Sequence, residues 1–395
     1  VQGSEDFFYV DDDGVLQLIP GEEMYGSTIM VPAEAKVIPA NIFAGKTSVK
    51  KVTFEEGSIL TDIEAGAFED SGLVEITLPV GVTVVKEATF KNSYLAKITF
   101  LGEVTTIEKE AFADTPLTAI TAPSVTSVGN NAFSNCSSLK TVKMAKLETI
   151  GSKAFQYCSA LNTGMNWSTK LTKIGSSAFK GCGFESLDLS AIATDTISME
   201  TGVFEGCTKL TSVEFPAGMT EIPGATFKGC NKLKSVNFEP TGTVSKITAI
   251  YENAFTNCAA LERLIIPASV SKIYASAFSG CGALTEVNIW NPNPTGDDFL
   301  IAQNAFPTLS NNNQLTMQGY NGKVQEYAIA KGYKFKTLYP SFAIEYYPSD
   351  YGTMTINKNP AIPGEVIQVK VTPKDGYYLA SDGLQATCAS AILEP

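Results

Sequence analysis

The chain has 395 residues, is 44% hydrophobic and 18% charged, carries a formal net charge of −12 and contains no histidine. This composition excludes a disordered chain, and the acidic balance argues against binding of nucleic acid or anionic lipid. The lack of histidine excludes Ser-His-Asp triads, Cys-His dyads and His-containing metal sites. No run of 18 or more apolar residues is visible, so we expect no direct membrane insertion of this chain.

Residues 1–37 are predicted to form an N-terminal cap. Two apolar runs, Phe7–Val10 and Val15–Leu18, flank the sequence Asp11–Gly14, which is typical of a hairpin. The three aspartates lack the alternating ligands and the later glutamate of a calcium loop, so we interpret them as a turn. The residues around Ile29 fit strand positions, which indicates a degenerate first coil.

Internal repetition is the strongest signal in residues 38–314. A phenylalanine anchor recurs at spacings of 21 to 28 residues, at Phe43, Phe68, Phe90, Phe112, Phe133, Phe155, Phe179, Phe204, Phe227, Phe255, Phe278 and Phe306. Five residues before each anchor stands an aliphatic residue or methionine: Ile38, Ile63, Val85, Ile107, Val128, Ile150, Ile174, Met199, Ile222, Ile250, Ile273 and Ile301. Downstream, the best units read C-x-x-L-x-x-V-x-F-P, as from Cys207 to Pro216.

This spacing predicts a solenoid of about 12 coils. The V-x-F triplet alternates inward and outward and is typical of a short strand in a parallel sheet. The upstream aliphatic predicts a second short strand, and the A-F-x-x-C piece a helical or 3₁₀ turn. Because one coil cannot bury its own apolar face, the stack must supply the stability.

Seven of the eight cysteines lie three residues after an anchor, at Cys136, Cys158, Cys182, Cys207, Cys230, Cys258 and Cys281. Earlier units carry Ser71, Ser93 and Thr115 at this position. Interchange with small residues indicates a packing position, so we predict free, buried thiols. Disulfides between adjacent coils are the alternative, whereas the spacing does not suit a metal site.

The middle residue of V-x-F is predicted to point outward and so to form a binding face. Its first four members are threonines, Thr53, Thr77, Thr99 and Thr121. The less uniform remainder supplies the candidate ligand-binding residues Lys143, Met165, Asp188, Glu214, Asn237, Ile265 and Asn288.

The two tryptophans complete the candidate ligand-binding set. Trp167 and Trp290 each lie twelve residues after an anchor and therefore share one repeat position, at the exit of the strand. An exposed pair could anchor a protein or a sugar ring. Alternatively, both rings pack at a corner of the coil.

The repeat ends before residues 315–339, which we predict to be a C-terminal cap. A short helix is expected from Lys323 to Lys331, with Gly332 as its stop. Residues 340–395 are expected to form a small β-sandwich-like module. Its length of about 55 residues is short for such a module, so either the fold is incomplete or the natural chain continues.

The A-F-x-x-C-x-x-L-x-x-V-x-F-P unit resembles the BspA-like leucine-rich repeats of bacterial cell-surface proteins, over roughly residues 29–338. The resemblance implies a β-rich, right-handed leucine-rich-repeat solenoid with short parallel strands and helical turns. It also implies secretion and adhesion or binding of host components, and it carries over no catalytic residues.

We therefore expect a non-enzymatic, secreted binding or adhesion protein on the surface of a bacterium. Its solenoid face would bind an extracellular host or microbial protein or glycan, and the chain would act as a monomer. The alternative is a structural spacer or stalk that projects another module from the cell. We expect no catalytic residues, no cofactor and no metal. A binder should expose an apolar or aromatic patch on one face, whereas a spacer should be uniformly polar.

Overall fold

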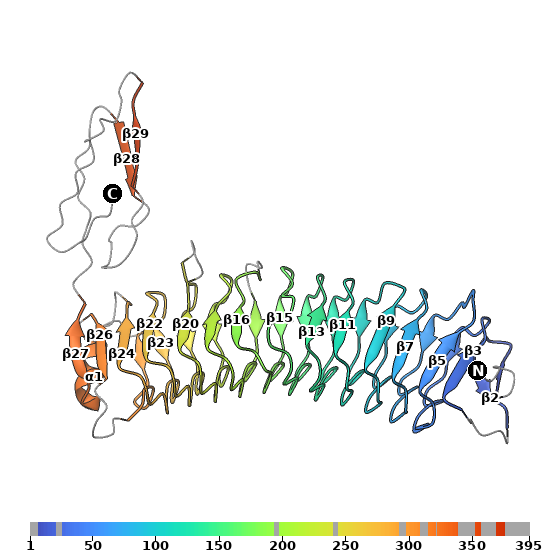
Figure 1. The fold of residues 1–395 in the computed structure, drawn as a ribbon. Helices are drawn as coiled ribbons and strands as arrows, with labels where there is room; N and C mark the ends of the chain where they lie inside the picture. The colour runs from blue at the N-terminus through green and yellow to red at the C-terminus, as the bar shows by residue number, and fades with distance from the viewer. Residues whose placement is uncertain are drawn as a thin grey trace.

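The computed structural model describes residues 7–20, 26–192, 197–239, 244–291, 298–308, 315–320, 322–338, 352–356 and 369–375. The described repeats stack side by side into an elongated, gently curved solenoid (Figure 1). Its strands are parallel from coil to coil, and helix is almost absent, as the repeat spacing predicts.

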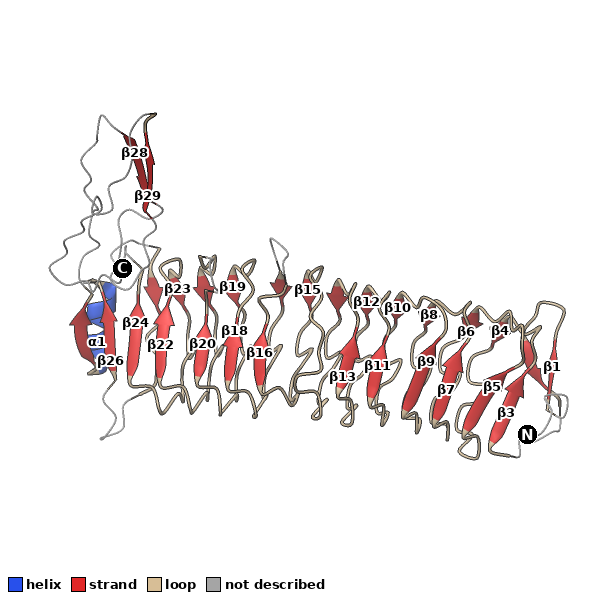
Figure 2. Cartoon of the chain, turned by 45° about the horizontal axis from the view of Figure 1, so that its top comes forward, coloured by secondary structure: helices blue, strands red, loops and turns tan. Residues whose placement is uncertain are grey.

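Most coils contribute two strands, so two rows of strands run along the solenoid (Figure 2). The long row consists of β3 (Thr28–Val31), β5 (Lys51–Phe54), β7 (Glu75–Leu78), β9 (Lys97–Phe100), β11 (Ala119–Thr121), β13 (Thr141–Lys143), β16 (Ser186–Asp188), β18 (Ser212–Glu214), β20 (Ser235–Asn237), β22 (Arg263–Ile266), β24 (Glu286–Ile289), β26 (Thr316–Gly319) and β27 (Lys334–Thr337). We call the outward side of this row the long-strand face.

The second row consists of two-residue strands: β4 (Val37–Ile38), β6 (Asp62–Ile63), β8 (Val84–Val85), β10 (Thr106–Ile107), β12 (Ser127–Val128), β14 (Thr149–Ile150), β15 (Lys173–Ile174), β17 (Ser198–Met199), β19 (Glu221–Ile222), β21 (Ala249–Ile250), β23 (Lys272–Ile273) and β25 (Leu300–Ile301). The last residue of each is the aliphatic or methionine that precedes an anchor by five positions. The predicted second strand is thus confirmed in every repeat.

The phenylalanine anchors form one continuous stack inside the solenoid. Successive rings from Phe43 to Phe306 lie 4.8–5.6 Å apart between centroids, and their planes differ by at most 14°. The backbone N–H of each anchor up to Phe278 donates to the carbonyl of the residue just before the next anchor, at 2.7–2.9 Å. Ring stacking and this third ladder therefore join every coil to the next.

The anchor segment forms hydrogen-bonded turns rather than a turn of helix. Around Phe112, for example, Glu110 and Asp114 both have positive φ, at 57° and 61°. Residues with positive φ likewise lie two positions before and two positions after each of the other anchors up to Phe278. Left-handed residues interrupt a right-handed helix, and the anchor N–H that would bond within a helix bonds to the next coil instead.

The seven described cysteines are buried free thiols, as predicted. Each Sγ donates to the carbonyl of the preceding coil's anchor; Cys182, for example, lies 3.1 Å from the oxygen of Phe155. In the earlier coils Ser93 and Thr115 donate instead to the anchor carbonyl of their own coil. The position therefore selects a small side chain that can donate one hydrogen bond.

Additional elements lie at the two ends of the repeats. An antiparallel pair, β1 (Phe8–Val10) and β2 (Leu16–Leu18), occupies the segment where a hairpin is expected. At the other end, the helix α1 (Lys323–Lys331) has the predicted bounds, and Gly332 ends it with a φ of 71°. In the C-terminal region, β28 (Gly352–Ile356) and β29 (Val369–Pro373) pair antiparallel. The rest of the expected β module lies outside the described residues.

Candidate binding face

Most of the predicted outward row does lie on the long-strand face. Lys143, Asp188, Asn237 and Ile265 are exposed, while Glu214 and Asn288 are half-buried. Strand register places Asp188, Glu214 and Asn237 side by side on β16, β18 and β20. Ile265 and Asn288 are likewise neighbours on β22 and β24.

Met165 does not belong to this outward row, and its predicted orientation was wrong. Its side chain is only 8% exposed, and it pairs with Val142, an inward residue of the preceding coil. The strand position is thus shifted by one residue in this coil, and Asn166 is the exposed residue that follows. An apolar side chain is more stable in the core than in water, which accounts for the shift.

The shift also moves Trp167. It takes the inward position that phenylalanine holds in V-x-F, and its ring lies edge-on to the anchor Phe179 at 5.3 Å between centroids. Trp290 instead follows the last residue of β24, Ile289, and is half-buried. The two tryptophans therefore do not share one position, which corrects the prediction, and Trp167 packs against the core.

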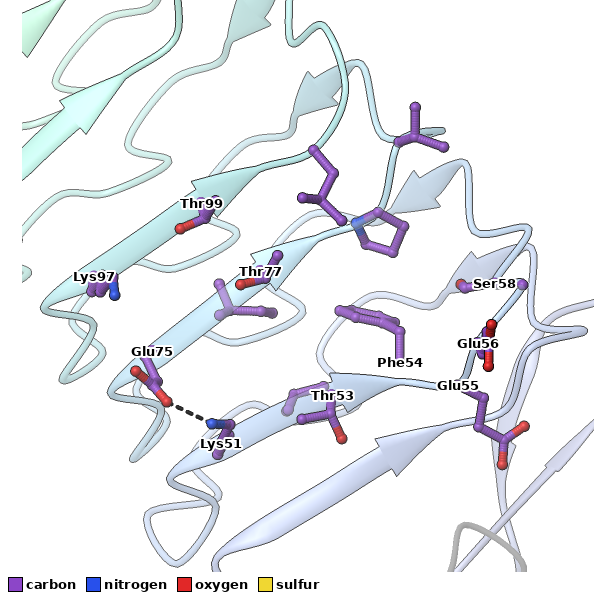
Figure 3. A pocket seen from close by; sticks show the side chains of 16 residues that line it. Lys51, Thr53, Phe54, Glu55, Glu56, Ser58, Glu75, Thr77, Lys97 and Thr99 are labelled. Atoms are coloured by element: carbon purple, nitrogen blue, oxygen red, sulfur yellow. Dashed lines mark hydrogen bonds and ion pairs between the residues drawn. The ribbon is translucent and has the colours of Figure 1, made fainter.

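A hollow of about 730 Å³ lies on the long-strand face across β5, β7 and β9. Each strand contributes one threonine to the lining: Thr53, Thr77 and Thr99 (Figure 3). Its apolar part is made by the half-buried Phe54 together with Pro79, Val80 and Leu101. We call these residues and their surroundings the β5–β9 hollow.

The hollow opens because β5 and β7 separate. Their register contains only two pairs, the second joining Val52 to Ile76, whereas β3–β5 and β7–β9 each have four. The connection after β5 is also longer. Nine positions separate Phe54 from Ile63, against seven from Leu78 to Val85 in the next coil. The extra residues lie in the loop Glu55–Ser58, which lines the hollow.

Charged side chains border the hollow at both ends of its strands. Lys51 and Glu75 form an ion pair of 2.7 Å at the start of the strands, visible as the dashed line in Figure 3. The hydrogen bond from Lys51 and the nearby charge of Lys97 lower the pKa of Glu75 below its ordinary value. At the opposite end, Glu55 accepts a hydrogen bond from the backbone of Ala33, and Glu56 is exposed.

The sequence reasoning missed this hollow, although a signal was present. Val80 is 68% exposed and Leu101 65%, at the corners that follow β7 and β9. At the corresponding corners the later coils carry small or polar residues, such as Ser124, Lys146 and Ala217, each three positions after its strand. Two large aliphatic residues on neighbouring exposed corners were the available clue.

The described residues contain neither a metal-binding cluster nor a membrane-spanning helix. No group of three or more metal-binding side chains comes together among them. In the same portion of the chain, no helix is both long and apolar enough to cross a membrane. The carboxylates near the hollow are at its rim and do not converge on one point (Figure 3).

Comparison with known proteins gives a family match and several similar folds. The family model described as "BspA type Leucine rich repeat region" matches residues 24–140, 126–244 and 241–345. A leucine-rich repeat protein from Bacteroides ovatus is 20% identical, with a TM-score of 0.55, over 85% of this chain and 99% of that one. A leucine-rich cell surface protein from Faecalibacterium prausnitzii is 27% identical, with a TM-score of 0.43, over 73% and 94%.

The pneumococcal vaccine antigen PcpA is 22% identical, with a TM-score of 0.48, over 83% of this chain and 82% of that one. A search of curated proteins finds no match. The similarity to the Bacteroides ovatus protein extends over nearly all of that chain and shows a common fold.

Proposed function

Because this chain belongs to the BspA-type leucine-rich repeat family, we propose that it is a secreted, non-enzymatic binding protein of a bacterial cell surface. The long-strand face contacts an extracellular protein or glycan. The phenylalanine stack holds the strands rigidly, so the face is formed before the partner arrives, which lowers the entropic cost of binding.

The observation that supports binding over a spacer role is the apolar surface of the β5–β9 hollow. Val80 and Leu101 are both about two-thirds exposed, and Ile59, which follows the lining loop, is half exposed. Contiguous exposed apolar surface costs solubility and is typical of interaction sites. A spacer would gain nothing from aliphatic residues at these corners.

The test is a binding screen with two matched variants. The purified chain is measured against a panel of extracellular matrix proteins and a glycan array. In the face variant, Thr77→Arg and Thr121→Arg place bulky cations on the long-strand face, where both threonines are exposed. In the control variant, Thr105→Arg and Thr172→Arg place the same charges beside the short strands, at two exposed positions.

We expect binding to at least one member of the panel, lost in the face variant and kept in the control variant. If the native chain binds nothing, or if both variants lose binding equally, the long-strand face is not the binding surface and the spacer role is favoured.

A further inference from the structure

We propose that the β5–β9 hollow recognises an extended protein segment that inserts an aliphatic or aromatic side chain and places a basic side chain beside Glu56. This inference rests on the proposed binding function and names the ligand class and the place of contact. The occupant is a peptide segment of another extracellular protein.

The size and lining of the hollow suit an apolar side chain. Its volume of about 730 Å³ is in the range of ligand pockets. Phe54 and Pro79 form its base, while Val80 and Leu101 stand exposed at its edge. An inserted side chain would remove these surfaces from water, and burial of apolar area is the main favourable contribution to such contacts. The lining presents no fully exposed aromatic ring on which a sugar could stack.

The strand edges suit a peptide main chain. Beyond Val52 and Ile76, the residues Thr53 and Phe54 of β5 have no register partners on β7. The hydroxyl groups of Thr53, Thr77 and Thr99 lie in a row across the same surface. The hydroxyl of Thr53 donates to the carbonyl of Ile29 at 3.3 Å and can accept from a ligand N–H, whereas those of Thr77 and Thr99 can donate or accept. The row can therefore satisfy N–H and C=O groups of an extended segment that crosses the three strands.

The charges give the segment a direction. Glu55 and Glu56 make the end of the hollow beyond β5 acidic, and Glu56 is exposed there. At the start of the strands, Lys51 is paired with Glu75, and Lys97 is exposed. Complementary charge favours a basic residue of the ligand on the Glu56 side and an acidic residue on the Lys97 side.

The experiment selects peptides from a random-peptide phage library on the immobilised full chain. Phage that also bind the variant Val80→Ser/Leu101→Ser are removed, and the selected sequences are synthesised and titrated by fluorescence anisotropy. Both substituted residues are exposed, so the variant should retain the native fold, as thermal unfolding would verify. The matched control is Ile265→Ser, which truncates a half-exposed aliphatic residue on β22, far along the same face.

We expect the selected peptides to share an apolar residue with a lysine or arginine close to it. Their affinity should fall about tenfold or more in Val80→Ser/Leu101→Ser, equivalent to about 1.4 kcal/mol. Glu56→Lys should also weaken them, with a smaller salt dependence of the remaining binding. Ile265→Ser should leave their affinity unchanged.

Three results would overturn the inference. One is that no peptide is enriched over the counter-selection. Another is that the selected peptides bind the doubly substituted chain as tightly as the native one. The third is that a glycan, rather than a peptide, is the ligand whose binding depends on Val80 and Leu101. If a matrix protein or glycan binds the long-strand face without sensitivity to these two residues, the proposed function stands while the inference about the hollow fails.

Discussion

At the scale of single residues, the cysteine position shows how the repeat selects side chains. The position is closed on all sides, so volume and one hydrogen-bond donor decide what fits. Cys207 is fully buried, and its thiol donates to the carbonyl of Phe179 at 3.3 Å. Ser93 satisfies the same requirement within its own coil. A thiol is thus replaceable by a hydroxyl but not by a longer chain.

We predict that Cys207→Ser lowers the free energy of unfolding by only about 1 kcal/mol, because the hydroxyl keeps a hydrogen-bonded partner. Cys207→Leu adds carbon atoms to a closed position and should cost roughly 1–3 kcal/mol. Urea denaturation of both variants measures the difference. Equal losses in the two variants would show that volume does not control this position.

Burial also predicts how the thiols respond to pH. It raises the pKa of Cys136, Cys230 and Cys281 from an ordinary value of 9.0 to about 12. Thiols of the unfolded chain ionise first, so the stability linked to these groups is complete below about pH 9. It is then lost as the pH rises toward 12.

The expected result is a steep fall in the denaturation midpoint above pH 9, which Cys230→Ser/Cys281→Ser makes shallower. The eighth cysteine, Cys388, does not belong to the repeat position and is replaced by serine for a labelling test. In this background, a thiol reagent should label the folded chain slowly at pH 8 and the urea-unfolded chain rapidly, because the thiolate is the reactive form. Rapid labelling of the folded chain would contradict the burial of the seven thiols.

At the scale of elements, the length of one loop decides whether two strands pair. The coil that contains β5 has two more residues between its strands than the next coil, and the β5–β7 ladder stops after two pairs. The hollow is therefore associated with the longer loop Glu55–Ser58 and with Pro79, which has no N–H to donate to β5.

Deleting Glu56 and Gly57 should give this coil the loop length of its neighbour and extend the β5–β7 ladder by the pair Thr53–Thr77, beyond which Pro79 has no N–H to donate. Hydrogen exchange followed by mass spectrometry should then show slower exchange of the backbone amide of Phe54, which would donate to the carbonyl of Thr77. The same deletion should abolish the peptide binding that we propose for the hollow. Unchanged exchange at the Phe54 amide would mean that the loop is not what separates the strands.

How far the sequence predicts the fold follows from which residues repeat. The anchors, the aliphatic residues of the short strands and the cysteines occupy equivalent positions in successive repeats and lie in the core. Such positions can be found from their spacing alone. Met165 was misplaced because ten positions separate Phe155 from this inward residue, against nine from Phe133 to Val142 in the preceding coil. The alternation of Met165 and Trp167 would have given the correct register, since it reproduces V-x-F. The hollow depends on the divergence of two strands, which the spacing of the repeated residues does not predict.

At the scale of the whole molecule, the continuous anchor stack makes each coil depend on its neighbours. Phe155 lies mid-stack, with rings at 5.0 and 5.2 Å on either side. In such arrays, stability is approximately a sum of coil terms and nearest-neighbour terms. A defect in the middle should therefore weaken the coupling between the two halves.

We predict that Phe155→Ala lowers the free energy of unfolding by about 3–5 kcal/mol and splits one thermal transition into two. Differential scanning calorimetry detects both effects. The control is Tyr157→Ala, two residues away at an exposed corner, which should preserve a single transition. A single, merely shifted transition for Phe155→Ala would mean that the halves remain coupled through the strand ladders alone.

The hydrogen bonds between anchors run along the axis of the solenoid, so a mechanical load applied to the two ends passes through every coil in series. Under such a load, coils unfold one after another from an end of the solenoid. Each coil that yields releases the 21 to 28 residues between anchors, roughly 70–100 Å of extended chain. A protein tethered at one end and held by a partner at the other would thus lengthen in steps under flow while its remaining coils kept their shape.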